Sequence, residues 1–302
     1  MSELVDLSAL NAPDVLETLD FENLLSERKK QFIALFPADE QALWTQRLTL
    51  ESEPVVKLLE ENCYLQLLER KRINEAAKAT MLAYATGADL DVIAANFNVK
   101  RLVIRAADNS VTPPIEEELE SDSDLRLRAQ LAFEGLSVAG PRNAYIYHAL
   151  SAHGDIADVS VKSPSPANVT VTVLSKQGKG AAANDLLNIV AAKLNDENIR
   201  PIADRVSVQS AKIKDYQISA KLYSYKGPEI EVIKNTATEK LKEYVNQKHR
   251  LGRDISVSGI YAALHVEGVQ RVELTQPNAD IILSNDTAGY CTNINLSVVN
   301  SE

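Results

Sequence analysis

The sequence predicts an α+β protein: an N-terminal helical region with one long bundle helix, followed by two small αβ modules with mixed or antiparallel sheets. Three observations indicate this fold class. Apolar residues recur every three to four positions through the first hundred residues, as on one face of a helix. Further along, short runs alternate apolar and polar residues, as in strands covered on one face. Helical patterns separate these runs, and the expected divisions are residues 1–110, 111–200 and 201–302.

The N-terminal helices are expected at residues 14–25, 39–50 and 54–86, with a short one at 89–95. In the longest of them, Ser52 can act as N-cap, Pro54 fits the first turn and Gly87 can provide a left-handed stop. At 1.5 Å per residue this helix would be roughly 50 Å long.

The long helix carries two apolar stripes, although one stripe suffices for a helix that lies on its own domain. The first stripe contains Val55, Val56, Leu59, Cys63, Ile73, Ala77, Met81 and Tyr84. The second contains Leu58, Leu65, Leu68, Ala76, Ala79 and Ala83. Either both stripes are internal to a monomeric bundle, or one is a seam for another chain. The second stripe is the predicted partner interface, because its alanines permit close approach of a neighbouring helix.

A middle segment separates the helices from the mixed half. After an apolar stretch at 99–107, residues 110–114 read Ser-Val-Thr-Pro-Pro and are predicted to form a linker. The acidic run 116–124 precedes a helix expected at 125–136, which Ser121 or Ser123 can cap. An EF-hand is excluded, because Leu127 and Phe133 stand where its glycine and terminal glutamate belong.

The second half of the chain alternates helices and strands. Helices are expected at 141–152, 181–194, 229–247 and 256–265, and strands at 158–161, 168–173, 205–208, 212–225, 269–275, 280–283 and 292–299. A faint repeat lies within it: a helix, a glycine turn at Gly154 or Gly268, and a strand occur twice. Two related αβ modules are therefore predicted.

Composition and charge exclude several classes of function. The net charge is −10, with 14 Lys and Arg against 25 Asp and Glu in residues 1–140 and 18 against 17 in residues 141–302. Neither half has the basic stripe that phosphate neutralisation requires, so no nucleic-acid partner is expected. No apolar run reaches membrane-spanning length, and the acidic N-terminus is unlike a signal peptide. Cys63 and Cys291 are far apart, which excludes a zinc site or disulfide framework.

One loop resembles a cofactor site. Gly178-Lys179-Gly180 begins a G-x-G-x-x-A pattern between a strand and a helix, as in dinucleotide-binding folds. The preceding strand alternates with polar residues, however, and no acid follows at the end of a second strand. A nucleotide- or dinucleotide-binding α/β enzyme is therefore kept as the alternative to a scaffold, and a flexible strand-to-helix loop is the favoured interpretation.

No other group of residues predicts chemistry. The four histidines, His148, His153, His249 and His265, lack the i, i+4 spacing with glutamate of a zinc helix. The Gly135–Ala139 segment lacks the final glycine of a nucleophile elbow. We therefore expect no catalytic residues, no metal, no cofactor and no enzymatic activity.

Several segments together resemble the baseplate J-like family of contractile phage tails. They are residues 51–60, 72–79, 81–91, 120–128, 139–141 and 158–164. The resemblance covers most of residues 45–180, and after residue 201 it is one of pattern more than of letters. Larger members of the family carry a β-rich insert where this chain has only residues 99–120.

The resemblance implies a structural role in the tail baseplate of a virion, with assembly in the host cytoplasm. Copies of the chain would form homodimeric pairs and a ring, and would join a tail protein I partner in baseplate wedges around the tube. A lysozyme-like, sheath-initiating wedge protein is the implied neighbour. Residues 201–302 are expected to supply self-association through the edges of their strands.

Overall fold

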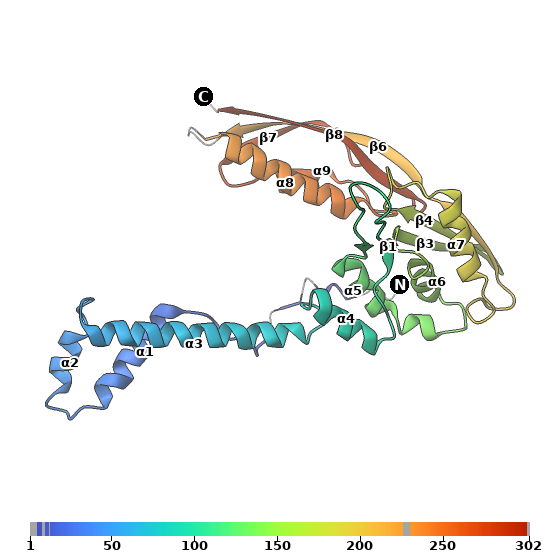
Figure 1. Cartoon of the computed structure of the whole chain (residues 1–302). Helices are drawn as coiled ribbons and strands as arrows, with labels where there is room; N and C mark the ends of the chain where they lie inside the picture. Colours follow the sequence, from blue (N-terminus) through green and yellow to red (C-terminus); the bar gives the residue numbers. More distant parts are fainter. Residues whose placement is uncertain (1–4, 8–9, 12, 226–229, 301–302) are drawn as a thin grey trace. The chain divides into compact units, whose positions relative to one another are not determined.

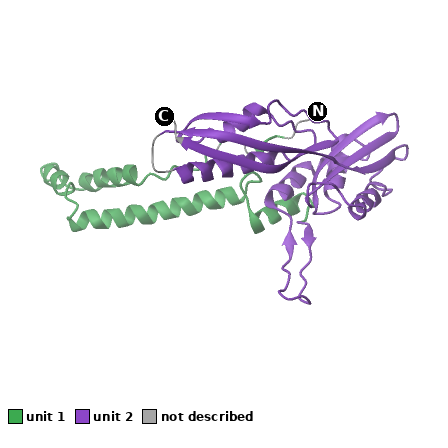
Figure 2. Ribbon diagram, turned by 90° about the horizontal axis from the view of Figure 1, so that it is seen from above, with its two compact units in different colours: residues 1–100 green, residues 101–302 purple. Residues whose placement is uncertain are grey.

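The computed structural model describes residues 5–7, 10–11, 13–225 and 230–300. It confirms the α+β class (Figure 1). The chain divides into two compact units, residues 1–100 and residues 101–302, which Figure 2 shows in different colours. In the described part of the chain, no helix combines the length and the hydrophobicity that crossing a lipid bilayer requires.

The described residues of the first unit form the α-helices α1 Phe21–Ala34, α2 Gln41–Arg47, α3 Pro54–Ala79 and α4 Gly87–Asn96. Helix α1 packs along α3. The prediction placed α1 too early, at 14–25, because the helix begins only where the Asp20 carboxylate accepts a hydrogen bond from the backbone N–H of Asn23. Upstream of α1, the Glu17 backbone N–H donates to the Asn74 Oδ1 at 3.0 Å, and the Asn74 side-chain amide donates to the Glu17 carbonyl at 2.8 Å.

Helix α3 is shorter than its sequence pattern predicted. Pro54 lies in the first turn as expected, but Glu53 and not Ser52 occupies the N-cap position. The helix ends at Ala79 instead of residue 86, where the Thr80 hydroxyl donates to the Ala77 carbonyl at 2.8 Å and so satisfies a terminal acceptor. Gly87 does have a left-handed φ of 54°, yet it begins α4 and does not stop α3.

The second unit opens with a hairpin of β1 Val103–Arg105 and β2 Glu118–Leu119, which pair antiparallel. The predicted linker at 110–114 is wrong, because these residues form the turn of this hairpin. The backbones of Asp108 and Ile115 exchange two hydrogen bonds of 2.9 Å, which hold both ends of the turn together. Figure 2 shows the hairpin projecting from the rest of the second unit.

Glu120 and Ser121 join this hairpin to the helices that follow, α5 Asp122–Leu131 and the short 3₁₀ helix Glu134–Leu136. Ser121 caps α5 as predicted and accepts a hydrogen bond from the Asp124 N–H at 3.3 Å. The Arg128 guanidinium donates to both carboxylate oxygens of Glu120 at 2.7 and 2.5 Å. Both residues are buried, at about 4% exposure. This pair therefore fixes the hairpin base onto α5.

The central module has one three-stranded mixed sheet. Helix α6 Arg142–Leu150 precedes β3 Ile156–Ser165 and β4 Asn168–Ser175, and helix α7 Asn184–Leu194 leads to β5 Arg205–Ser210. The order is β3-β4-β5, with β3 antiparallel and β5 parallel to β4. Apolar side chains of α6 and α7 form one core with the sheet. The other face is polar, and there Gln209 donates to the Thr172 hydroxyl at 3.0 Å.

The C-terminal module repeats this plan. It consists of β6 Lys212–Ser224, α8 Ile230–Lys248, α9 Val257–Leu264, β7 Val269–Gln276 and β8 Thr287–Asn300, in the sheet order β7-β6-β8. Helices α8 and α9 share a core with the sheet. The predicted strand at 280–283 is wrong, since only Ile281 forms a bridge there, with Ile255. The predicted start of α8, residue 229, lies outside the described residues.

The weak sequence repeat corresponds to a structural one. In each module a helix and a glycine turn lead into an edge strand, β3 or β7, that runs antiparallel to the central strand. In each, the other edge strand is parallel to the centre. Chain order differs, because the central strand follows its antiparallel neighbour in the first module and precedes it in the second. The prediction of two αβ units with mixed sheets is confirmed.

Replacing Arg128 with Met is expected to lower the free energy of unfolding by about 3–5 kcal/mol, because Glu120 would remain as a buried, unpaired charge. Chemical denaturation monitored by circular dichroism measures this. Arg105→Met is the matched control, since its pair with Glu118 is 58% and 52% exposed, and its loss should cost less than about 1 kcal/mol. Equal losses for the two variants would contradict the assigned role of the buried pair.

Candidate partner-binding surface

The exposed face of α3 is the first candidate site. Val56 and Cys63, from the first apolar stripe, are 1% and 0% exposed. Leu58, Leu65 and Leu68, from the second, are 58%, 52% and 43% exposed. At 100° per residue, these three leucines lie on the opposite side of the helix from Cys63.

Within the described part of this unit, the first stripe is buried at Val56 and Cys63, on the side where α1 packs, and the second stripe is uncovered. Arg28 of α1 donates to Gln66 of α3 at 2.5 Å, and Glu17 pairs with Arg70 at 3.2 Å. Burial raises the pKa of the Cys63 thiol, which the nearby Arg28 charge partly opposes. Val56 and Cys63 of the first stripe are thus internal to the monomer, while Ile73, further along the same stripe, is 62% exposed.

The alanines of the second stripe extend its line towards the end of α3. Ala76 is exposed and Ala79 is half-buried as the last residue of the helix. Ala83 lies beyond the end of α3, in the following turn, so the helix does not place it in the stripe as predicted. Leu58, Leu65, Leu68, Ala76 and Ala79 form what we call the outer stripe of α3.

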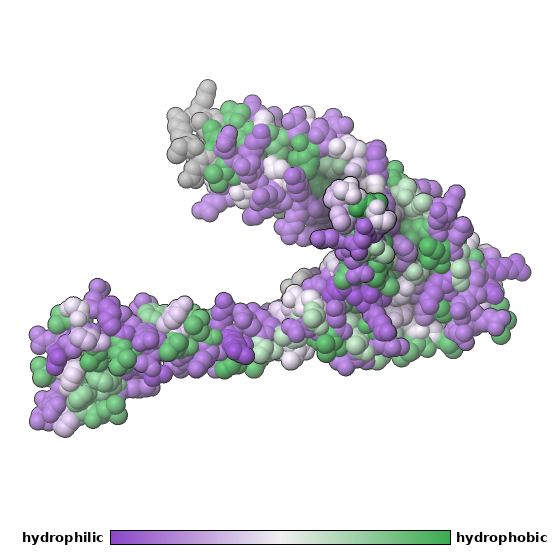
Figure 3. Space-filling model, in the orientation of Figure 1, coloured by the Kyte–Doolittle hydropathy of each residue, from purple (hydrophilic) through white to green (hydrophobic). Residues whose placement is uncertain are grey.

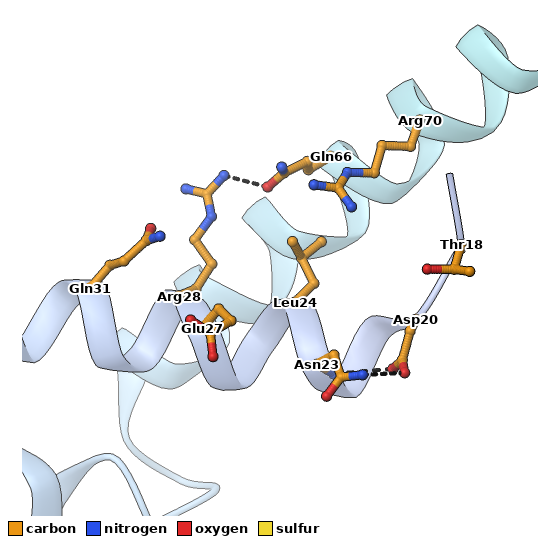
Figure 4. Close-up of a pocket in the computed structure, with 9 residues that line it drawn as sticks. All are labelled: Thr18, Asp20, Asn23, Leu24, Glu27, Arg28, Gln31, Gln66 and Arg70. Atoms are coloured by element: carbon orange, nitrogen blue, oxygen red, sulfur yellow. Dashed lines mark hydrogen bonds between the residues drawn. The ribbon is translucent and has the colours of Figure 1, made fainter. Parts of the chain in front are cut away.

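A groove of about 560 Å³ runs between α1 and α3. Figure 4 shows that polar side chains line it, with Arg28 reaching across to Gln66. Its other lining residues include Asp20, Glu27 and Arg70, and Leu24 is its apolar member. These groups form no nucleophile–base arrangement. The groove is a seam between two helices and does not have the apolar lining of a small-molecule site.

An aromatic cluster that the sequence pattern did not indicate lies between α1 and α2. Phe36 stacks on Trp44 with ring centroids 4.6 Å apart, and Phe32 meets Trp44 edge-on at 5.5 Å. The Arg47 guanidinium lies 4.7 Å from the Trp44 ring centroid. Exposed leucines accompany this cluster, at Leu35, Leu43 and Leu50. Apolar side chains show on the surface of this unit in Figure 3.

The Gly178–Gly180 loop packs against neighbouring residues of the second unit. Gly180 has φ of 108°, and a Cβ there would lie 2.7 Å from Leu174 Cδ1 and 3.1 Å from His249 Nε2. The Lys179 ammonium pairs with Asp215 of β6 at 2.5 Å. The backbone N–H of Ala182 donates to the Ser210 hydroxyl at 2.8 Å. These contacts account for the glycine pattern and disfavour the nucleotide-binding alternative.

The same region joins the two sheets. Asp158 of β3 accepts hydrogen bonds from the N–H groups of Leu251 and Val159, at 2.8 and 2.9 Å. Burial raises the pKa of Asp158, while these bonds and the nearby Arg250 charge oppose the rise. Arg250 also donates to the Ala157 carbonyl and lies 3.8 Å from the Asp124 carboxylate. Residues 249–253 therefore bind the C-terminal module to the central one.

The histidines have structural contacts. His148 Nε2 lies 3.1 Å from the Gly135 carbonyl oxygen, and burial lowers its pKa. His249 Nδ1 lies 2.8 Å from the Gly289 carbonyl oxygen. Among the described residues, no three His, Cys, Asp or Glu side chains gather as metal ligands would.

An α+β chain with a helical unit, two mixed-sheet modules and an uncovered helix stripe has the character of an assembly protein. Baseplate J-like family models match it in three places: the N-terminal domain over residues 51–108, the central domain over 137–210 and the C-terminal domain over 216–297. The chain belongs to the baseplate J-like family of phage-tail baseplate proteins, which confirms the resemblance of the sequence segments.

The chain is 59% identical over 289 residues to Baseplate protein J of Escherichia phage P2, covering 96% of each chain. Among solved structures, a chain of the anti-feeding prophage baseplate is similar with a TM-score of 0.41 and 14% identity. That similarity covers 60% of this chain and 43% of the other. Membership in this family confirms the prediction that the chain is a structural protein of the contractile-tail baseplate and is located in the virion.

The double substitution Leu65→Lys with Leu68→Glu is expected to leave the isolated chain folded, because both side chains are already about half exposed. Far-ultraviolet circular dichroism should show unchanged helicity, and the midpoint of thermal unfolding should stay within a few degrees of wild type. Cys63→Glu is the control on the buried side, where an unpaired charge should cost about 3 kcal/mol. Loss of helicity in the double variant would instead place the outer stripe in the monomer core.

Gly180→Ala is expected to destabilise the chain by about 1–3 kcal/mol, because the new methyl group meets Leu174 and the backbone is left-handed. Gly178→Ala, where nothing lies within 4 Å of the added Cβ, should cost less. Neither ATP nor NAD should change the melting temperature of wild type. A ligand-induced increase that Gly180→Ala abolishes would support the enzyme alternative.

Proposed function

We propose that this chain is a wedge protein of the contractile-tail baseplate that assembles with further copies of itself and with a tail protein I partner around the tail tube. A lysozyme-like, sheath-initiating wedge protein is its proposed neighbour, and the wedge assembles in the host cytoplasm. The chain has no proposed enzymatic activity, cofactor, nucleic-acid partner or membrane partner. The observation that carries the proposal is the outer stripe of α3 in a chain that belongs to the baseplate J-like family.

The geometry of α3 supports a helical partner on this stripe. Helix α3 has 26 residues and is about 39 Å long, whereas α1 has only 14 residues. Helix α1 is therefore too short to cover α3 along its whole length. Leu58, Leu65 and Leu68 point away from α1. Burying each leucine fully is worth about 1.5–3 kcal/mol. The small side chains of Ala76 and Ala79 then let a partner helix approach closely near the end of α3.

The two parts of the chain differ in net charge, and we use this difference to assign self-association. Residues 141–302 carry 18 Lys and Arg against 17 Asp and Glu, so copies of this part do not repel one another strongly. Residues 1–140 carry 14 against 25. We therefore assign self-association to residues 201–302. We assign the heterologous bundle to α3 because of its uncovered apolar stripe, since the charges of α3 itself are nearly balanced, with 5 Lys and Arg against 4 Glu.

Leu65→Lys with Leu68→Glu is expected to abolish the bundle with tail protein I and a second copy, because unpaired charges in a packed seam cost several kcal/mol. The measurement is co-expression with the neighbouring tail genes, affinity capture and mass determination of the complexes. Self-association through the C-terminal part should persist.

Ile202→Lys with Leu136→Glu is the matched control, since these side chains are 100% and 75% exposed and lie outside the proposed seam. This control should capture tail protein I at wild-type yield. Capture at wild-type yield by the α3 variant as well would contradict the proposed seam.

A further inference from the structure

The two edges of the C-terminal sheet differ in a way that bears on self-association. The β7 edge is charged: Arg271 lies 4.0 Å from the Tyr223 ring centroid, and Glu273 accepts a 2.8 Å hydrogen bond from the Tyr223 hydroxyl. Pro277 follows β7 directly. Charges and proline are the features that protect sheet edges from pairing with other chains.

The β8 edge has neither charges nor proline, although its register with β6 shifts once, between Cys291 and Asn293. Strand β8 has 14 residues, and from Thr287 to Asn300 the sequence contains no Asp, Glu, Lys, Arg or Pro. Its neighbour in the sheet is β6, with which it pairs in parallel. A long, uncharged edge strand is a template for another strand.

The chain itself covers only the beginning of this edge. Leu251 forms an antiparallel bridge with Ala288, and the Gly252 N–H donates to the Thr287 carbonyl at 3.0 Å. From Cys291 to Asn300, the described residues show no backbone hydrogen bond to any segment other than β6. In the described residues, the second half of β8 therefore has no strand paired on its outer edge. One acceptor there is used within the strand, because the Cys291 thiol donates to the Asn293 carbonyl at 3.4 Å.

A groove of about 280 Å³ lies beside the same edge, between α8 and β8. Val245, Tyr290 and Ile294 are among its lining residues, with Cys291 at the edge. Ile294 is half-buried, and its neighbours in the strand, Asn293 and Asn295, are exposed. A strand that joins β8 can therefore also place a side chain in this groove.

We propose that a second copy of this chain occupies the β8 edge, so that two β8 strands pair antiparallel about a two-fold axis and the two sheets become one of six strands. A two-fold axis makes identical edges antiparallel and self-complementary. The uncharged sequence permits this pairing, because like charges directly opposite each other would repel. This inference rests on the proposed self-association and names its surface.

The test uses the full chain and substitutions on the exposed face of β8. Asn293→Lys with Ser297→Lys places like charges on facing strands. It should weaken self-association about tenfold or more, measured by analytical ultracentrifugation and by light scattering after gel filtration. Asn293→Glu with Ser297→Glu should do the same. An equimolar mixture of the two variants should restore the dimer, because opposite charges then face each other.

Gln270→Lys with Thr275→Lys is the matched control, since both residues are exposed on the opposite edge strand, β7. This control should associate as wild type does. Undiminished association of the β8 lysine variant, or weakening without restoration in the mixture, would overturn the β8 pairing and leave the proposed wedge function standing. A wild-type chain that stays monomeric at high concentration, yet captures tail protein I, would also overturn it. Failure of both self-association and capture would remove the proposed function itself.

Discussion

A buried ion pair organises the second unit. Once Glu120 is removed from water at the base of the hairpin, its charge requires Arg128 of α5 as a partner, since an unpaired buried carboxylate is strongly destabilising. The neighbouring acids form ion pairs of their own. Asp122 pairs with Arg101 at 2.7 Å, and Asp124 pairs with Lys176 of the central module at 2.7 Å. Asp124 also lies 3.8 Å from Arg250 of the C-terminal module. The short segment from Glu120 to Arg128 thus contacts the hairpin and both sheet modules.

The first unit follows a different constraint, the mismatch between a long helix and a single short neighbour. Helix α1 satisfies one face of α3 and leaves the outer stripe to solvent in the described residues. The two units therefore differ: the second contains two sheet modules joined by hydrogen bonds and ion pairs, and the first contains a helix with an uncovered apolar stripe.

Features that depend on neighbouring residues can be predicted from the sequence, and features that depend on contacts with distant residues cannot. The N-cap at Ser121, Pro54 in the first turn and the alternating strands of both modules were predicted correctly, because each depends on neighbouring residues. The end of α3, the hairpin at Asp108 and Ile115, and the false strand at 280–283 were wrong, because competing hydrogen bonds decide them. The sequence pattern offered two equivalent stripes on α3, and only the position of α1 distinguishes them. The sequence places Glu120 in an acidic run ahead of a helix, and no local pattern there indicates its burial against Arg128.

The claim that the outer stripe of α3 is an intermolecular seam can be tested most directly by thiol labelling. With the half-buried Cys291 replaced by serine, Leu65→Cys should react rapidly with a maleimide in the free chain, while native Cys63 stays protected. In the complex with tail protein I, the labelling rate of Leu65→Cys should fall at least about tenfold, and an exposed reference, Thr45→Cys on α2, should keep its rate. An unchanged rate at Leu65→Cys in the assembled complex would contradict the account.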